Sequence, residues 1–100
     1  MTRILKPDFS RALRDVRLAR GKSQEALDAV SGRTYVSALE RGVKQPTIGK
    51  VAELAGVLDV HPLTLMTLAY LSKATPGETH KLLQRIGNEI VELMSSHATE

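Results

Sequence analysis

Two segments decide the fold of this chain: SQEAL at residues 23–27 and RTYVSALERG at residues 33–42. Ser23 is a favourable N-cap for a short helix, because its hydroxyl can accept a hydrogen bond from a free backbone N–H of the first turn. Gly32 is a turn residue between the segments, and Gly42 can end the helix that the second segment forms. The sequence therefore predicts two short helices joined by a tight turn.

The second of these helices has two chemically different faces. Val36 and Leu39 define its inward face, as Leu27 and Val30 do for the helix before it. Small polar and cationic side chains occupy the remaining positions: Arg33, Thr34, Ser37, Ala38 and Arg41. Arg can read guanine through two parallel hydrogen bonds, Thr offers a hydroxyl and a methyl, and Ala can touch a thymine methyl. This combination is typical of a helix that lies in a DNA groove.

Every other segment with a clear period also predicts a helix, and none shows strand alternation. The expected helices follow Asp8, run from Ile48 to Leu58 with an inward apolar stripe that begins at Ile48, and run from Leu63 to about Lys73, the last being the most apolar and so the most buried. Thr75, Pro76 and Glu78 form the capping-box pattern that begins a sixth helix. We predict an all-α fold with a five-helix domain over residues 1–74 and a C-terminal helix within residues 75–100.

Charge is distributed unevenly along the chain. Residues 1–50 carry 11 Lys and Arg against 5 Asp and Glu, whereas residues 51–100 carry 3 against 6. A basic half favours contact with a polyanion, although a solvated cationic surface has the same composition. The chain has no cysteine, which excludes disulfides and thiolate metal sites and fits a reducing, cytoplasmic location.

Many residue types, in order, resemble the Cro/phage-repressor family of XRE-type helix-turn-helix regulators, over about residues 9–70. The matching positions are Leu13, Arg14, Arg17, Gly21, Ser23, Gln24, Leu27, Thr34, Tyr35, Val36, Ser37, Leu39, Glu40, Arg41, Gly42 and Pro46. The resemblance implies a compact, lambda-repressor-like bundle of five helices. It also implies a transcriptional regulator, most often a repressor, that binds operator DNA as a dimer.

The resemblance also implies roles for single residues. Gln24 matches a phosphate-contacting glutamine, and Arg33, Thr34 and Ala38 match positions that face base edges. Ser37 and Arg41 flank these positions, and Lys44 and Gln45 lie in a loop that usually contacts the DNA backbone. Arg14 and Glu40 match a structural ion pair between the first and third helices. Tyr35 either donates its hydroxyl to a phosphate or packs at the helix junction, and Arg20 and Lys22 are further candidates for backbone contacts.

One departure from the family concerns the turn. The family has about two more residues between the second helix and the Arg that begins the third, whereas here Gly32 directly precedes Arg33. Either the second helix is shorter than usual or the turn is tighter.

The sixth helix carries an apolar stripe that must be buried somewhere. Leu83, Ile86, Ile90 and Leu93 form its centre. The stripe either folds back on the domain or pairs with a second subunit, and we expect dimerisation, since two half-sites bind more tightly than one.

No enzyme is expected, because the chain shows no nucleophile–base set, phosphate-binding glycine loop or paired carboxylates. His61, His80 and His97 have no partner at metal-ligand spacing, so neither a metal nor another cofactor is expected. The predicted function is a sequence-specific regulator of transcription that binds double-stranded DNA as a homodimer and acts as a repressor. The alternative is an antitoxin-like interaction protein that binds a toxin-type partner and for which DNA binding is secondary.

Overall fold

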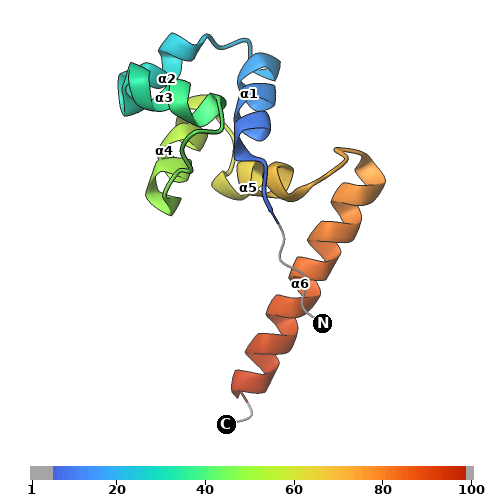
Figure 1. Ribbon diagram of the computed structural model, residues 1–100. Helices are drawn as coiled ribbons and strands as arrows, with labels where there is room; N and C mark the ends of the chain where they lie inside the picture. Colours follow the sequence, from blue (N-terminus) through green and yellow to red (C-terminus); the bar gives the residue numbers. More distant parts are fainter. Residues whose placement is uncertain (1–5, 99–100) are drawn as a thin grey trace. The chain divides into compact units, whose positions relative to one another are not determined.

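The computed structural model describes residues 6–98, and every regular element among them is a helix (Figure 1). The chain divides into two compact units between Tyr70 and Leu71. The first unit contains five helices: α1 (Phe9–Ala19), α2 (Gln24–Ser31), α3 (Arg33–Glu40), α4 (Ile48–Leu58) and α5 (Pro62–Tyr70). The second contains α6 (Pro76–Ala98). The predicted all-α fold is confirmed.

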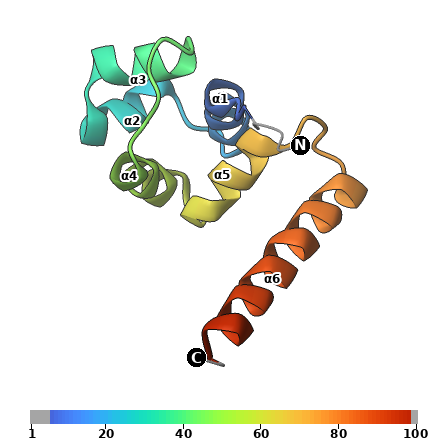
Figure 2. The ribbon, with the colours of Figure 1, turned by 60° about the horizontal axis from the view of Figure 1, so that its bottom comes forward.

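The core of the first unit is mostly aliphatic, with Phe9 as a buried aromatic side chain, and receives side chains from all five helices. α1 packs against α3 and α5, α2 packs against α3 and α4, and α4 packs against α5 (Figure 2). Leucines contribute most of the fully buried volume: Leu13, Leu27, Leu39, Leu54, Leu58 and Leu65. Burial of each such side chain stabilises the fold by about 1.5–3 kcal/mol relative to exposure.

Three expectations about burial are wrong. Val30 is exposed: Leu27 is the buried residue of α2, and Val30 lies in the last turn of this helix, close to Gly32. Ile48 is 90% exposed because it is the first residue of α4, a turn ahead of Val51, the first α4 residue to reach the core. α5 is apolar on all sides but buries only Leu65 and Ala69, since only its contacts with α1 and α4 cover it.

Side chains satisfy the ends of α1 and α4. An Asp8 carboxylate oxygen accepts a hydrogen bond from the Arg11 N–H at 3.2 Å, which lowers the pKa of Asp8 because the bond favours the ionised form. At the C-terminal end of α4, the Arg20 guanidinium donates hydrogen bonds to the carbonyls of Leu58 and Asp59, both at 3.0 Å. Arg20 is therefore a C-terminal cap of α4, which uses part of its hydrogen-bonding capacity within the fold, and its contact with a DNA backbone stays a prediction.

Among residues 6–98, no single helix has both the length and the apolar content needed to cross a membrane. α4 and α5 meet those two criteria only as a pair, which is bent by 108° at its break.

The turn between α2 and α3 consists of Gly32 alone. Its φ is 82° and its ψ is 144°, a combination that side chains strongly disfavour. α2 retains eight residues, from Gln24 to Ser31, so the missing residues shorten the turn and leave the helix intact. The angle between α2 and α3 thus depends on one glycine.

Replacing Gly32 with Ala is expected to lower the free energy of unfolding by about 1–3 kcal/mol, because the backbone cannot keep this conformation with a Cβ. A Cβ at this position would meet no atom within 4 Å, so crowding does not contribute. Gly56 is the matched control, since it also has open space around it but has no positive φ. Gly56→Ala should stabilise α4 by about 0.5–1 kcal/mol. Urea unfolding followed by circular dichroism measures both changes, and equal effects would contradict the role of the turn.

Candidate nucleic-acid interface

A buried carboxylate, Glu40, connects α3 with α1 and α2. The Arg17 guanidinium donates two hydrogen bonds to Glu40, from Nε to Oε2 at 2.7 Å and from Nη2 to Oε1 at 2.9 Å. Both side chains are largely buried, with 13% and 6% of their surfaces exposed. Arg17 also donates to the Lys22 carbonyl, and Gln24 donates from Nε2 to Glu40 at 3.2 Å. The hydrogen bonds to Glu40 raise the pKa of Arg17, because they favour its charged form. Together the bonds of this cluster fix the end of α3 against the start of α2.

The predicted partner of Glu40 was wrong: the ion pair uses Arg17, and Arg14 is exposed. The helical period explains the difference. Leu13 is fully buried, so Arg17, one turn later, lies beside the same buried face. Arg14 directly follows Leu13 and is therefore rotated by about 100° away from it.

The outward face of α3 presents four of the predicted reading residues together. Arg33, Thr34 and Arg41 are exposed, and Ser37 is half-buried. Arg33, Ser37 and Arg41 follow one another at four-residue steps, so they form a row along the helix. Buried Val36, Leu39 and Glu40 occupy the opposite side.

Ala38 does not belong to this face, and the prediction that it meets base edges is wrong. Its side chain is only 5% exposed. The chain turns back after Gly42, which has a φ of 75°, and the N–H groups of Val43 and Lys44 both donate to the Ala38 carbonyl. These bonds cap the C-terminal end of α3 and involve the Ala38 carbonyl, whereas its side chain lies among the buried residues of the unit.

The loop after α3 adds exposed polar side chains. Lys44 and Gln45 are exposed there, as predicted for residues that could reach a DNA backbone. Tyr35 is half-buried and packs against the core, and the ammonium groups of Lys44 and Lys50 each lie 5.9 Å from its ring centroid. The sequence did not indicate that Lys50 lies near Lys44, because Lys50 belongs to α4 and what the two lysines share is the proximity of their ammonium groups to the Tyr35 ring.

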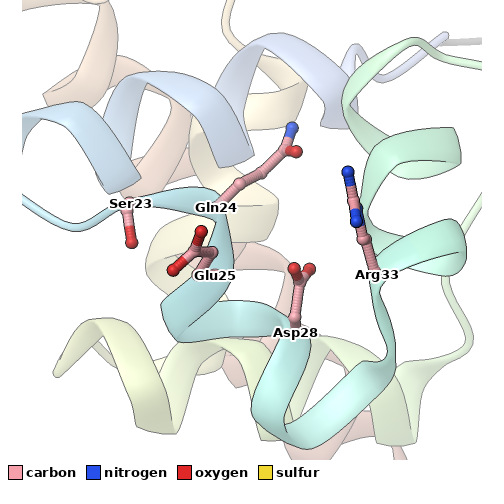
Figure 3. A pocket seen from close by; sticks show the side chains of 5 residues that line it. All are labelled: Ser23, Gln24, Glu25, Asp28 and Arg33. Atoms are coloured by element: carbon pink, nitrogen blue, oxygen red, sulfur yellow. The ribbon is translucent and has the colours of Figure 1, made fainter.

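A shallow hollow lies between the start of α2 and the start of α3 (Figure 3). Its lining residues are Ser23, Gln24, Glu25, Asp28 and Arg33. Two carboxylates, those of Glu25 and Asp28, line the hollow together with Arg33, and Asp28 Oδ1 is buried without a hydrogen-bond partner. The floor of the hollow therefore disfavours a phosphate, and Gln24 has one amide N–H left for a ligand after its bond to Glu40.

α6 forms a unit with an apolar stripe exposed along its length. Thr75 Oγ1 accepts from the Glu78 N–H at 3.2 Å, which confirms the predicted cap, and Arg85 pairs with Glu89 at 3.2 Å on the polar side. Leu83, Ile86, Ile90 and Leu93 are 37–67% exposed. Elsewhere in the described part of the chain, no three His, Asp or Glu residues lie close enough to hold a metal ion.

The ion pair leads to a direct prediction. Arg17→Ala leaves the Glu40 carboxylate buried without its cation and should lower the free energy of unfolding by about 3–5 kcal/mol. Arg14→Ala, which removes an identical but exposed side chain three residues earlier, should change it by less than about 0.5 kcal/mol. Thermal and urea unfolding of both variants decide between the two pairings, and an Arg14 effect as large as that of Arg17 would refute the assignment.

Comparison with known proteins gives two matches. A family model described as helix-turn-helix matches residues 13–65, which contain α2, α3 and α4 completely. An uncharacterized HTH-type transcriptional regulator, y4dJ, from Sinorhizobium fredii (strain NBRC 101917 / NGR234) is 36% identical over 69 residues. That alignment covers 67% of this chain and 84% of the relative. No solved structure matches the chain significantly.

Proposed function

Because the chain belongs to the helix-turn-helix family of Cro- and phage-repressor-type regulators, we propose that it is a sequence-specific transcriptional repressor that binds operator DNA as a homodimer. The observation that carries this proposal is the outward face of α3, with Arg33, Thr34, Ser37 and Arg41. The acidic residue of α3, Glu40, lies on the opposite side of the helix, buried and paired with Arg17. The name of the Sinorhizobium relative supports a role in transcription.

In this proposal α3 enters the major groove and its polar row reads base edges. A helix in this groove places side chains where each base pair presents a distinct set of donors and acceptors. Lys44 and Gln45 of the following loop reach the sugar-phosphate backbone, which orients the helix but carries little sequence information. Binding at a promoter then represses transcription by excluding the polymerase.

Removal of two reading residues should abolish specific binding. We expect the double variant Ser37→Ala, Arg41→Ala to lose about 2–4 kcal/mol of affinity for a duplex selected by the wild-type protein from a random pool, since a good bidentate contact alone contributes about 1–3 kcal/mol. Lys81→Ala is the control, because it removes one positive charge from α6 and should leave affinity unchanged. Gel-shift titration measures the effect, and unchanged affinity of the double variant would refute the docking.

The exposed stripe of α6 supports the homodimer. Leu83, Ile86, Ile90 and Leu93 alternate in steps of three and four residues, the spacing that packs one helix against another in a coiled coil. The 23 residues of α6 extend over about 35 Å, which is long enough for a stable two-helix contact. A dimer also allows each copy to occupy one half-site of a two-fold symmetric operator.

Charges placed in the stripe should separate the subunits. Ile86→Glu together with Ile90→Glu is expected to give a monomer, because two carboxylates in the seam would have to be buried or repel their counterparts. Val91→Glu is the control: Val91 is 66% exposed but lies outside the three-and-four pattern, so this variant should remain dimeric. Sedimentation equilibrium of the three proteins gives the masses. A monomeric wild-type protein would contradict the homodimer and favour the alternative, an antitoxin-like protein whose stripe binds a toxin-type partner.

A further inference from the structure

Tyr35 joins three elements of the N-terminal unit. The residue lies in the first turn of α3, Lys44 lies in the loop that follows this helix, and Lys50 lies in the first turn of α4. The Nζ atoms of Lys44 and Lys50 are each 5.9 Å from the centroid of the Tyr35 ring. The two ammonium groups are therefore no more than twice this distance apart, although they belong to different segments.

An aromatic ring attracts cations to its electron-rich face, and this attraction opposes the repulsion between two ammonium groups. Lys50 has a partial counter-charge, since its Nζ also lies 3.0 Å from Glu53 Oε2. Among the ion pairs of residues 6–98, none involves Lys44. The arrangement thus gathers positive charge at a half-exposed site and leaves it incompletely neutralised.

We infer that Tyr35 is a positioning residue whose ring holds Lys44 and Lys50 ready for the phosphates of DNA. The inference rests on the proposed function and extends it to two residues outside the reading face. Lysine side chains lose much rotamer freedom when they bind, so a ring that restricts them beforehand reduces the cost of binding. A packing role alone would need only an apolar side chain, and it would make the ring irrelevant to affinity.

The test measures binding to a mixed-sequence duplex, because non-specific affinity arises almost entirely from backbone contacts. Tyr35→Leu should weaken binding at low salt by about 5- to 30-fold, because two lysine side chains would then have to be ordered on binding, and Tyr35→Phe should bind like the wild type. When Lys44→Ala is introduced into the wild-type sequence, the slope of log affinity against log salt should become less steep by about 1. The same substitution in the Tyr35→Leu background should change the slope by clearly less. Circular dichroism verifies that each variant is folded.

A second measurement uses the free protein. The ring current of Tyr35 should displace the ε-methylene proton resonances of Lys44 and Lys50, and Tyr35→Leu should remove the displacement. Absence of a displacement in the wild type would overturn the inference without reference to DNA.

The outcomes separate the inference from the proposed function. If the wild type binds DNA but Tyr35→Leu binds equally well, or if Lys44→Ala has the same effect in both backgrounds, the role of Tyr35 is wrong and the proposed function stands. If Tyr35→Phe binds as weakly as Tyr35→Leu, the hydroxyl and not the ring is responsible, which also overturns the inference. A wild type without salt-dependent binding to any duplex overturns both.

Discussion

The buried bond between Arg17 and Glu40 is the interaction on which the geometry of the interface depends. It joins α1 to α3 at a site where water cannot replace either partner, and Gln24 adds a hydrogen bond from the start of α2 to the same carboxylate. A buried ion pair adds little net stability compared with apolar residues of the same size, but removing only one of its two partners is costly, because the other charge stays buried. Its value here lies in orientation, because the guanidinium and the carboxylate meet in one geometry and so fix where the outward row of α3 points.

The cations of the basic half therefore divide into two groups with different tasks. Arg17 and Arg20 are committed to internal bonds, the first with Glu40 and the second with the carbonyls that end α4. Arg33, Arg41 and Lys44 are exposed and could face a nucleic acid. Net charge along the sequence consequently overstates the charge that can face a nucleic acid, since part of it neutralises groups within the fold.

The sequence was sufficient for the helices and for most of the core, because caps and apolar periods are local signals. The Thr75–Glu78 cap and the buried Leu13, Leu54 and Leu58 are examples. Prediction from the sequence failed for contacts between residues that lie far apart in the chain. The choice between Arg14 and Arg17 required the rotation of α1 against α3, and the burial of Ala38 required the packing of the other elements around α3. The association of Lys50 with Tyr35 had no sequence signal, because it arises only when the start of α4 lies near the Tyr35 ring.

The one-residue turn at Gly32 affects whether α3 of this chain could be replaced by the corresponding helix of a relative. With a single residue between α2 and α3, the chain has no slack in which to absorb a change of crossing geometry. A third helix taken from a relative with the usual, longer connection would meet this scaffold in a different orientation, even if every base-reading side chain were kept. The unit that could be exchanged between scaffolds is thus the whole pair of helices with its glycine, and substitutions on the surface of α3 disturb this geometry less than replacement of the helix.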